Sequence, residues 1–295
     1  MALLNIRNLH LSMRSFEGEL PILRGIDLRI ERGEVWGMVG ETGSGKSLTG
    51  LSVSRLISPS IGRYLRGEVL FEGQDLLKAS ERDMRRLRGR KIGMIFQDPT
   101  TNLNPAFRIS TQLIDVALHA AESDPAVLGL PSGATRRQRR AAARTKAIEM
   151  LGKVGIAEPE ARIDAYPHQF SGGMRQRMLI AMAMIGRPDL LIADEPTTAL
   201  DVSVQAQILR LIHDLVTESN IGVLLITHNL GVVAQVCTHV AVMYRGRILE
   251  TGRVREVLKH PTHPYTAALL AAIPTAHTAR GTLRGIGDIM VGQDA

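Results

Sequence analysis

The sequence is poor in cysteine, in aromatic residues and in long apolar runs. Its one cysteine, Cys237, cannot form a disulfide within the chain, which is compatible with a reducing compartment. Aromatic residues make up only 3% of the 295 residues, too few to supply a platform for stacking nucleic-acid bases. The most apolar stretch, 222–244, is interrupted well short of the about 18 apolar residues that predict a membrane span. We therefore expect the chain not to cross a membrane by itself.

The composition that remains is that of a globular protein with a basic surface. Hydrophobic residues make up 44% and charged residues 22%, and the formal net charge is +7. Much of the excess lies in two runs, "ERDMRRLRGRK" (81–91) and "RRQRRAAARTK" (136–146). Such runs are typical of solvated helical faces, but they would also attract an anionic lipid surface or nucleic acid. Charge alone does not choose between these interpretations.

Four short apolar runs predict the strands of a parallel sheet: 35–39, 91–96, 190–193 and 223–227. None of them alternates cleanly, which is typical of strands covered by helices on both faces. Polar residues follow each run: a glycine-rich loop, then Gln97, then Asp194 with Glu195, and finally His228. Because ligands of open α/β sheets bind beyond the carboxyl ends of the strands, we expect these side chains to converge on one ligand.

The rest of the chain divides into segments around this sheet. Residues 1–34 alternate apolar and polar positions with turn residues between them, which predicts an antiparallel flank. Between about 100 and 188 the strand pattern gives way to helical runs at 110–121, 135–154 and 172–186, which predict an inserted helical subdomain. A short extension over 251–295 contains "HPTHPYTAALLAAIP".

The loop "GETGSGKS" (40–47) matches the pattern G-x-x-x-x-G-K-[ST] and carries the strongest chemical signal. Its glycines allow backbone N–H groups to surround phosphates, while Lys46 reaches the outer phosphates and the Ser47 hydroxyl binds magnesium. An apolar strand before it and a helix after it give the context that this motif requires. The predicted phosphate-binding residues are Gly40, Glu41, Thr42, Gly43, Ser44, Gly45, Lys46, Ser47 and Leu48.

The segment "LLIADEP" supplies carboxylates at the end of a buried strand, where an acidic group needs a cation or hydrogen bonds. Asp194 would hold the magnesium, and Glu195 is placed to polarise an attacking water. Alone, the pair could simply cap the turn that follows. Gln97 and His228 could likewise be ordinary turn or surface residues, but their shared position at strand ends favours a role at the same ligand.

The segment "FSGGMRQRMLIAMAMI" (170–185) raises a second question. Ser171 could cap a helix there, and Gly172 and Gly173 leave backbone N–H groups accessible, so the helix start suits an anion. The chain would then have two phosphate sites.

In chain order, six motifs resemble those of the ATP-binding subunit of an ATP-binding cassette (ABC) transporter. They are the phosphate loop, "FQDP" around Gln97, "FSGGMRQR", "LLIADEP", "TALD" (198–201) and "ITHN" around His228. The resemblance covers about 1–250 and implies a P-loop α/β cassette that is a Mg²⁺-dependent ATPase. It assigns Gln97, Glu195, His228 and Lys46 to catalysis.

The family also implies why one chain has two phosphate sites. Two such subunits stack head to tail, so Ser171, Gly172 and Gly173 contact the nucleotide held by the neighbour. Asp201 lies across that interface and links the two sites. The resemblance places Mg²⁺ on Ser47, Gln97 and Asp194, with ATP as the nucleotide.

Two stretches resemble importers of di- and oligopeptides, with nickel and metal-chelate importers as the alternative: the segment around "FSGGM" and the "HPYTAALLAAIP" extension. The resemblance implies a second, non-identical ATPase subunit, two membrane permease subunits and an extracytoplasmic solute-binding protein. It places the chain on the cytoplasmic face of the membrane. The iron–sulfur cysteine cluster of many peptide importers is absent from 251–295, which weakens the peptide assignment relative to nickel.

Two other functional classes remain as alternatives. A soluble ABC ATPase acting on nucleic acid would suit the basic charge, but such proteins usually add coiled coils, zinc-binding cysteines or a second cassette. A regulator without turnover would have little need for Glu195. We therefore expect no nucleic-acid partner. For the residue that stacks on adenine, Phe16 and Met13 both remain candidates.

Overall fold

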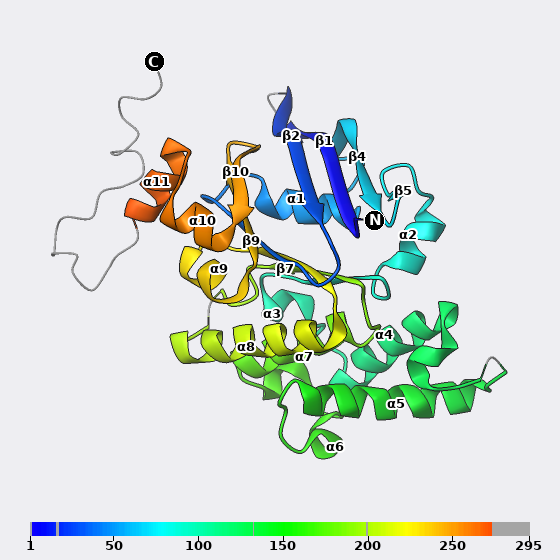
Figure 1. Ribbon diagram of the computed structural model, residues 1–295. Coiled ribbons are helices and arrows are strands. Elements are labelled where there is room, and N and C mark those ends of the chain that lie inside the picture. The colour runs from blue at the N-terminus through cyan, green and yellow to red at the C-terminus, as the bar shows by residue number, and fades with distance from the viewer. Residues whose placement is uncertain (1, 16–17, 132, 199, 273–295) are drawn as a thin grey trace.

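The four runs predicted as parallel strands form the centre of one sheet in the computed structural model, which describes residues 2–15, 18–131, 133–198 and 200–272 (Figure 1). Neighbouring strands in this centre are parallel. In spatial order they are β3 (Val35–Val39), β8 (Gly222–Ile226), β7 (Leu190–Asp194) and β6 (Ile92–Ile95). Beyond β3 the sheet continues with two strands that the sequence patterns did not identify, the parallel β9 (His239–Tyr244) and the antiparallel β10 (Arg247–Arg253).

The predicted antiparallel flank forms a second sheet that packs against the first. Its first two strands are β1 (Leu4–Ser15) and β2 (Gly18–Ile30), paired antiparallel as expected. The structure adds β4 (Gly62–Phe71) and β5 (Gln74–Asp75), which come from later in the chain. A buried apolar cluster, which includes Leu9 and Met38, fills the space between the two sheets.

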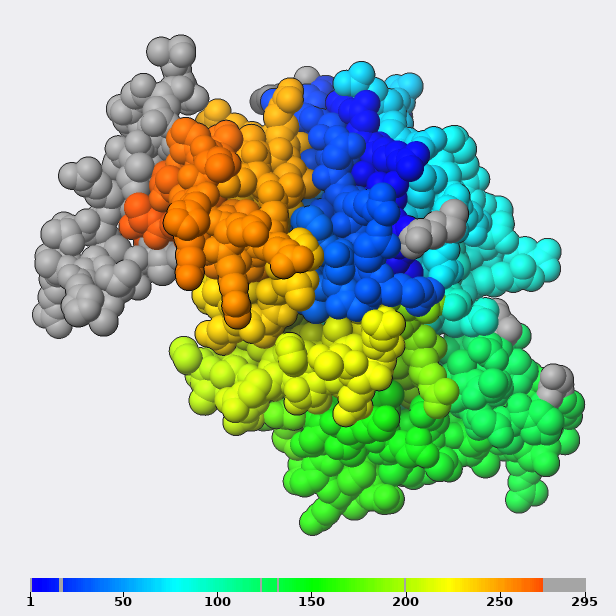
Figure 2. All heavy atoms as spheres, in the orientation of Figure 1, coloured from blue at the N-terminus to red at the C-terminus, as the bar shows by residue number. Residues whose placement is uncertain are grey.

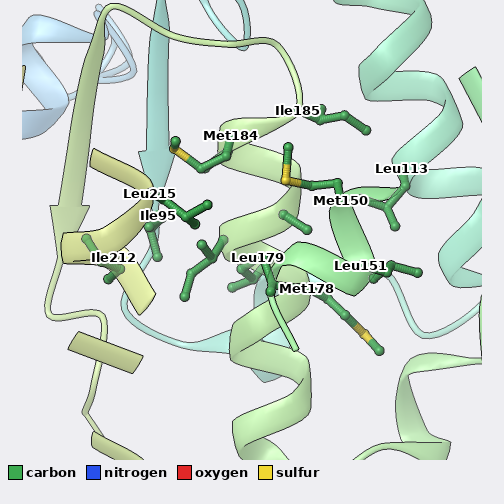
Figure 3. Close-up of a cluster of buried hydrophobic side chains, with 14 of the residues drawn as sticks. Ile95, Leu113, Met150, Leu151, Met178, Leu179, Met184, Ile185, Ile212 and Leu215 are labelled. Atoms are coloured by element: carbon green, nitrogen blue, oxygen red, sulfur yellow. The ribbon is translucent and has the colours of Figure 1, made fainter. Parts of the chain in front are cut away.

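The inserted helices follow β6 and lie on the face of the central sheet that is turned away from the second sheet (Figures 1 and 2). The three predicted helical runs correspond to α4 (Ile109–Ser123), α5 (Arg136–Lys153) and α7 (Gly172–Met184). Side chains from these helices, including Leu113, Leu151 and Leu179, form a cluster that continues to the central sheet (Figure 3). This core joins the inserted helices to the central sheet.

The remaining helices lie within the insert and elsewhere in the chain. Within the insert they are α3 (Pro99–Asn102), η1 (Pro125–Leu128), α6 (Pro159–Arg162) and η2 (Pro167–Gln169). Elsewhere they are α1 (Lys46–Val53), α2 (Glu81–Leu87), α8 (Val202–Ser219), α9 (Leu230–Val236), α10 (Val254–Lys259) and α11 (Pro264–Ala271). None of the helices in the described ranges is both long and apolar enough for a membrane crossing.

The two basic runs lie largely on helix surfaces. The first spans α2, where Arg88 pairs with Glu81 at 2.6 Å. The second begins α5, which Thr135 caps by accepting a hydrogen bond from the Gln138 backbone N–H at 3.3 Å. Later in α5, Arg144 pairs with Asp164 at 2.6 Å. Both runs therefore include solvated helical faces with local acidic partners.

Candidate active site

The loop between β3 and α1 adopts a conformation that depends on glycine. Gly43 and Gly45 have φ angles of 82° and 105°, in the left-handed region that favours glycine. At Gly40 a Cβ atom would lie 2.0 Å from the carbonyl oxygen of Met243 on β9, closer than any real contact. The backbone can therefore curl tightly at the carboxyl end of β3, as a phosphate cradle requires.

Lys46 points into this loop. Its ammonium group donates hydrogen bonds to the carbonyl oxygens of Gly40 (2.8 Å) and Glu41 (2.7 Å), and the residue is buried. Burial lowers the pKa of Lys46, and the negative charges of Glu195, Asp194 and Glu41 oppose that shift. A desolvated cation held by carbonyl groups is prepared to transfer its hydrogen bonds to an anion.

Ser47 and Asp194 form a site suited to a hard cation. The Ser47 hydroxyl donates to Asp194 Oδ1 at 3.0 Å, although the two residues are 147 positions apart. Burial raises the pKa of Asp194, while the Ser47 hydrogen bond and the nearby Lys46 act to lower it. A buried carboxylate beside a hydroxyl is a ligand set that Mg²⁺ prefers, so the residues present fit that ion.

Glu195 is the centre of a polar cluster at the ends of three strands. Its carboxylate accepts hydrogen bonds from Thr198 Oγ1 (2.7 Å) and Gln97 Nε2 (3.1 Å), and His228 Nδ1 lies 3.1 Å away. Burial acts to raise the pKa of Glu195, but the hydrogen bonds from Thr198 and His228 outweigh it, and the pKa is lowered overall. These hydrogen bonds therefore favour the ionised carboxylate, which is the form that can accept a proton.

The backbone at Glu195 is also unusual. Its φ of +44° is uncommon for a residue with a side chain. The Glu195 N–H donates to the carbonyl oxygen of Ile226 on β8 at 2.8 Å, which helps to hold this conformation. Strained backbone of this kind is concentrated at functional sites, because the surrounding structure must enforce it.

A cleft of about 380 Å³ lies between the loop and the polar residues at the strand ends. The convergence of the strand ends that the sequence patterns indicated is therefore present, and it joins the loop to β6, β7 and β8. The lining residues are Ile22, Thr42, Gly43, Gly45, Lys46, Ser47, Leu48, Gln97, Glu195 and His228. Glu41, Ser44 and Asp194 contact Lys46 or Ser47 behind this surface.

Sequence reasoning missed three residues at or behind the cleft: Ile22, Thr198, which donates a hydrogen bond to Glu195, and Tyr265, whose hydroxyl accepts from the Glu41 N–H of the loop. Ile22 on β2 lines the cleft and had no motif to mark it. Of the two adenine candidates, Met13 packs against the cluster between the sheets, and Phe16 lies outside the described residues.

The predicted second anion site lies elsewhere. Ser171 caps α7 by accepting a hydrogen bond from the Met174 N–H at 3.4 Å, and Ser171, Gly172 and Asp201 are exposed. Gly173 is half-buried, close enough to Val204 that a Cβ atom would lie 2.8 Å from it. Among the described residues, none from this group lines the cleft around Lys46. The start of α7 is therefore exposed and separate from the cleft around Lys46.

Comparisons with known proteins agree with this arrangement. The family model described as ABC transporter matches residues 23–198, and the one described as Oligopeptide/dipeptide transporter, C-terminal region, matches residues 249–293. The Oligopeptide transport ATP-binding protein OppD of Bacillus subtilis (strain 168) is 46% identical over 277 residues, covering 94% of this chain and 73% of that protein. The Dipeptide transport ATP-binding protein DppD of the same strain is 44% identical over 271 residues, which cover 92% of this chain and 76% of that protein.

A solved structure shares the fold. The ATP-binding cassette MJ0796, in a dimeric post-hydrolysis state bound to ADP and Pi, aligns with a TM-score of 0.70 at 24% identity. The alignment covers 85% of this chain and 99% of that one. This structural similarity confirms the P-loop cassette fold that the motifs predicted.

Proposed function

The chain belongs to the ABC transporter family, as its motifs indicated, and on that premise we propose that it is an ATP-hydrolysing subunit of an importer for di- and oligopeptides. The observation that carries the peptide assignment is the match of residues 249–293 to the C-terminal region of oligopeptide and dipeptide transporters. The 46% and 44% identity to the two Bacillus subtilis relatives named for peptide transport supports it. These relatives support the peptide assignment over the nickel and nucleic-acid alternatives.

The geometry supports a direct division of labour at the nucleotide. Lys46 and backbone N–H groups of the loop bind the outer phosphates of ATP. Ser47, Asp194 and the side-chain oxygen of Gln97 would hold Mg²⁺, which supplies charge neutralisation at the phosphate oxygens. Glu195, oriented by Thr198 and Gln97, accepts a proton from the attacking water.

His228 completes the cluster around the reacting phosphate. Its side chain is 61% exposed in the cleft, and its Nδ1 lies beside the Glu195 carboxylate. From this position His228 can orient the carboxylate and donate a hydrogen bond toward the γ-phosphate. His228 would thereby position the Glu195 carboxylate and the γ-phosphate relative to each other.

The exposed start of α7 supports a dimer of cassettes. Ser171, Gly172 and Gly173 would close over ATP bound to a second, non-identical subunit, and Asp201 would lie at the interface. Loss of the γ-phosphate would release the closed state, and the motion would pass to two permease subunits that receive solute from an extracytoplasmic binding protein. The chain would thus work as a peripheral subunit on the cytoplasmic face of the membrane.

Reconstituted transport tests the function directly. The full chain, purified with the membrane subunits that bind it, should drive uptake of a labelled tripeptide into liposomes only when MgATP is supplied on the cassette side. The same vesicles should not accumulate ⁶³Ni. Nickel uptake without peptide uptake would contradict the peptide assignment, and absence of ATP hydrolysis by the assembled complex would contradict the ATPase itself.

Ser171→Arg should inactivate the assembled complex while sparing nucleotide binding at the chain's own loop. An arginine at the start of α7 would block its close approach to the partner's γ-phosphate, whereas Lys46 is unaffected because Ser171 does not line its cleft. We expect turnover of the complex to fall by about a hundredfold, the loss typical of removing one transition-state donor. Phosphate release and equilibrium binding of an ATP analogue measure the two effects.

Ser80→Arg is the matched control, because Ser80 also caps an exposed helix start, that of α2. It should leave turnover near the wild-type value. If Ser171→Arg instead weakened nucleotide binding to the isolated chain, α7 would belong to the chain's own site and the head-to-tail arrangement would be wrong.

A further inference from the structure

Tyr265, on α11 of the C-terminal extension, contacts the phosphate loop. Its side chain is fully buried, and its hydroxyl oxygen accepts a hydrogen bond from the backbone N–H of Glu41 at 3.4 Å. The Glu41 carbonyl accepts from Lys46 Nζ at 2.7 Å and from the Ser44 N–H at 3.2 Å. Both backbone groups of Glu41 are thus engaged, one by the extension and the other by the loop.

The Tyr265 ring is held in a separate small core. It lies against the ring of Tyr244 at the end of β9, with ring centroids 4.4 Å apart. Buried residues around it include Val242 of β9 and Val257 of α10. The neighbouring β9 residue, Met243, is the one whose carbonyl confines Gly40 at the start of the loop. The phosphate loop therefore rests on β9 and on α11 together.

A second set of hydrogen bonds fixes the start of α11. The Glu250 carboxylate, on β10, accepts from the Thr262 N–H and hydroxyl, both at 2.8 Å, and from the His263 N–H at 3.1 Å. His263 Nδ1 in turn accepts from the Tyr265 N–H at 3.0 Å and so caps the helix. Glu250 thereby sets the position from which Tyr265 reaches the loop.

We propose that Tyr265 is a positioning residue for the phosphate loop, and that the C-terminal extension tunes nucleotide affinity through its contact with Glu41. The inference rests on the proposed ATPase function. By engaging the Glu41 N–H, Tyr265 holds Glu41 in place, and the loop keeps the shape that presents Lys46 and its remaining N–H groups to the phosphates. A loop that is already ordered loses less conformational entropy when it binds its ligand, so affinity is higher.

Tyr265→Phe removes the hydroxyl and keeps the ring. Removing one neutral hydrogen bond to a part-buried N–H should weaken binding of a non-hydrolysable ATP analogue by about three- to tenfold. KM for ATP should rise by a similar factor, with kcat changed much less, because Tyr265 does not touch the reacting phosphate. Calorimetry and steady-state kinetics on the full chain measure these quantities.

Two further measurements separate positioning from a general loss of stability. Hydrogen exchange at the Glu41 amide of the nucleotide-free chain should accelerate in Tyr265→Phe, whereas it should stay protected in the matched control Tyr244→Phe. Glu250→Ala should weaken analogue binding in the wild-type background but add little to Tyr265→Phe, since both act through the same contact.

Nucleotide affinity within twofold of wild type, with unchanged exchange at Glu41, would overturn the proposal. Additive effects of Glu250→Ala and Tyr265→Phe would also contradict it. If wild-type chain failed to bind nucleotide, the proposed function itself would be wrong, whereas the exchange rate at Glu41 would still report whether Tyr265 orders the loop.

Discussion

Lys46→Ala should reduce ATP turnover by about a thousandfold, the upper range for removing one preorganised group that stabilises transition-state charge. The ammonium group is the cation that reaches the outer phosphates, so binding of an ATP analogue should also weaken by about tenfold to a hundredfold. The folded chain should lose little stability, because the desolvation that lowers the Lys46 pKa offsets the hydrogen bonds that its ammonium group donates to Gly40 and Glu41. We therefore expect Tm to stay within about 3 °C of wild type.

Lys259→Ala is the control for loss of one positive charge, since Lys259 is exposed at the end of α10. It should leave affinity and turnover unchanged. Binding and turnover are measured on the same preparation by calorimetry and phosphate release. Normal hydrolysis by Lys46→Ala would remove the loop from the role of phosphate site, whatever its geometry.

Glu195→Gln should bind ATP but lower kcat by about a hundredfold or more, within the range for loss of a general base. The substitution preserves the shape of the cluster, because a glutamine oxygen can still accept from Thr198 and Gln97. The glutamine NH₂ can donate to His228 Nδ1 when the histidine adopts the tautomer that leaves this nitrogen unprotonated. The fold should therefore be intact. Because ATP remains unhydrolysed, the closed assembly should accumulate, which light scattering in the presence of MgATP would detect.

The matched control is Glu218→Gln, an exposed carboxylate near the end of α8. It should neither lower kcat nor favour a larger assembly. A kcat equal to wild type in Glu195→Gln would exclude Glu195 as the proton acceptor. Reduced turnover with weaker ATP binding would instead place Glu195 in nucleotide binding.

Much of this site could be predicted from the amino-acid sequence. The loop at 40–47 has a fixed local pattern because glycine, lysine and serine perform separate tasks within a few positions of one another. Gln97, Glu195 and His228 followed from a simpler rule, namely that parallel strands bring their carboxyl ends to the same edge of a sheet. Neither inference needs knowledge of which strands are neighbours.

The sequence by itself determined the loop, the strands that carry the polar residues and the inserted helices, because these features follow from local composition and periodicity. Only the tertiary structure decided that β9 and β10 extend the sheet, that Ile22 lines the cleft and that Tyr265 supports Glu41. Tyr265 and Glu41 are 224 positions apart, and no local pattern records which buried hydroxyl meets which backbone N–H. That pairing is fixed by how the C-terminal helices pack on β9, a property of the folded chain as a whole.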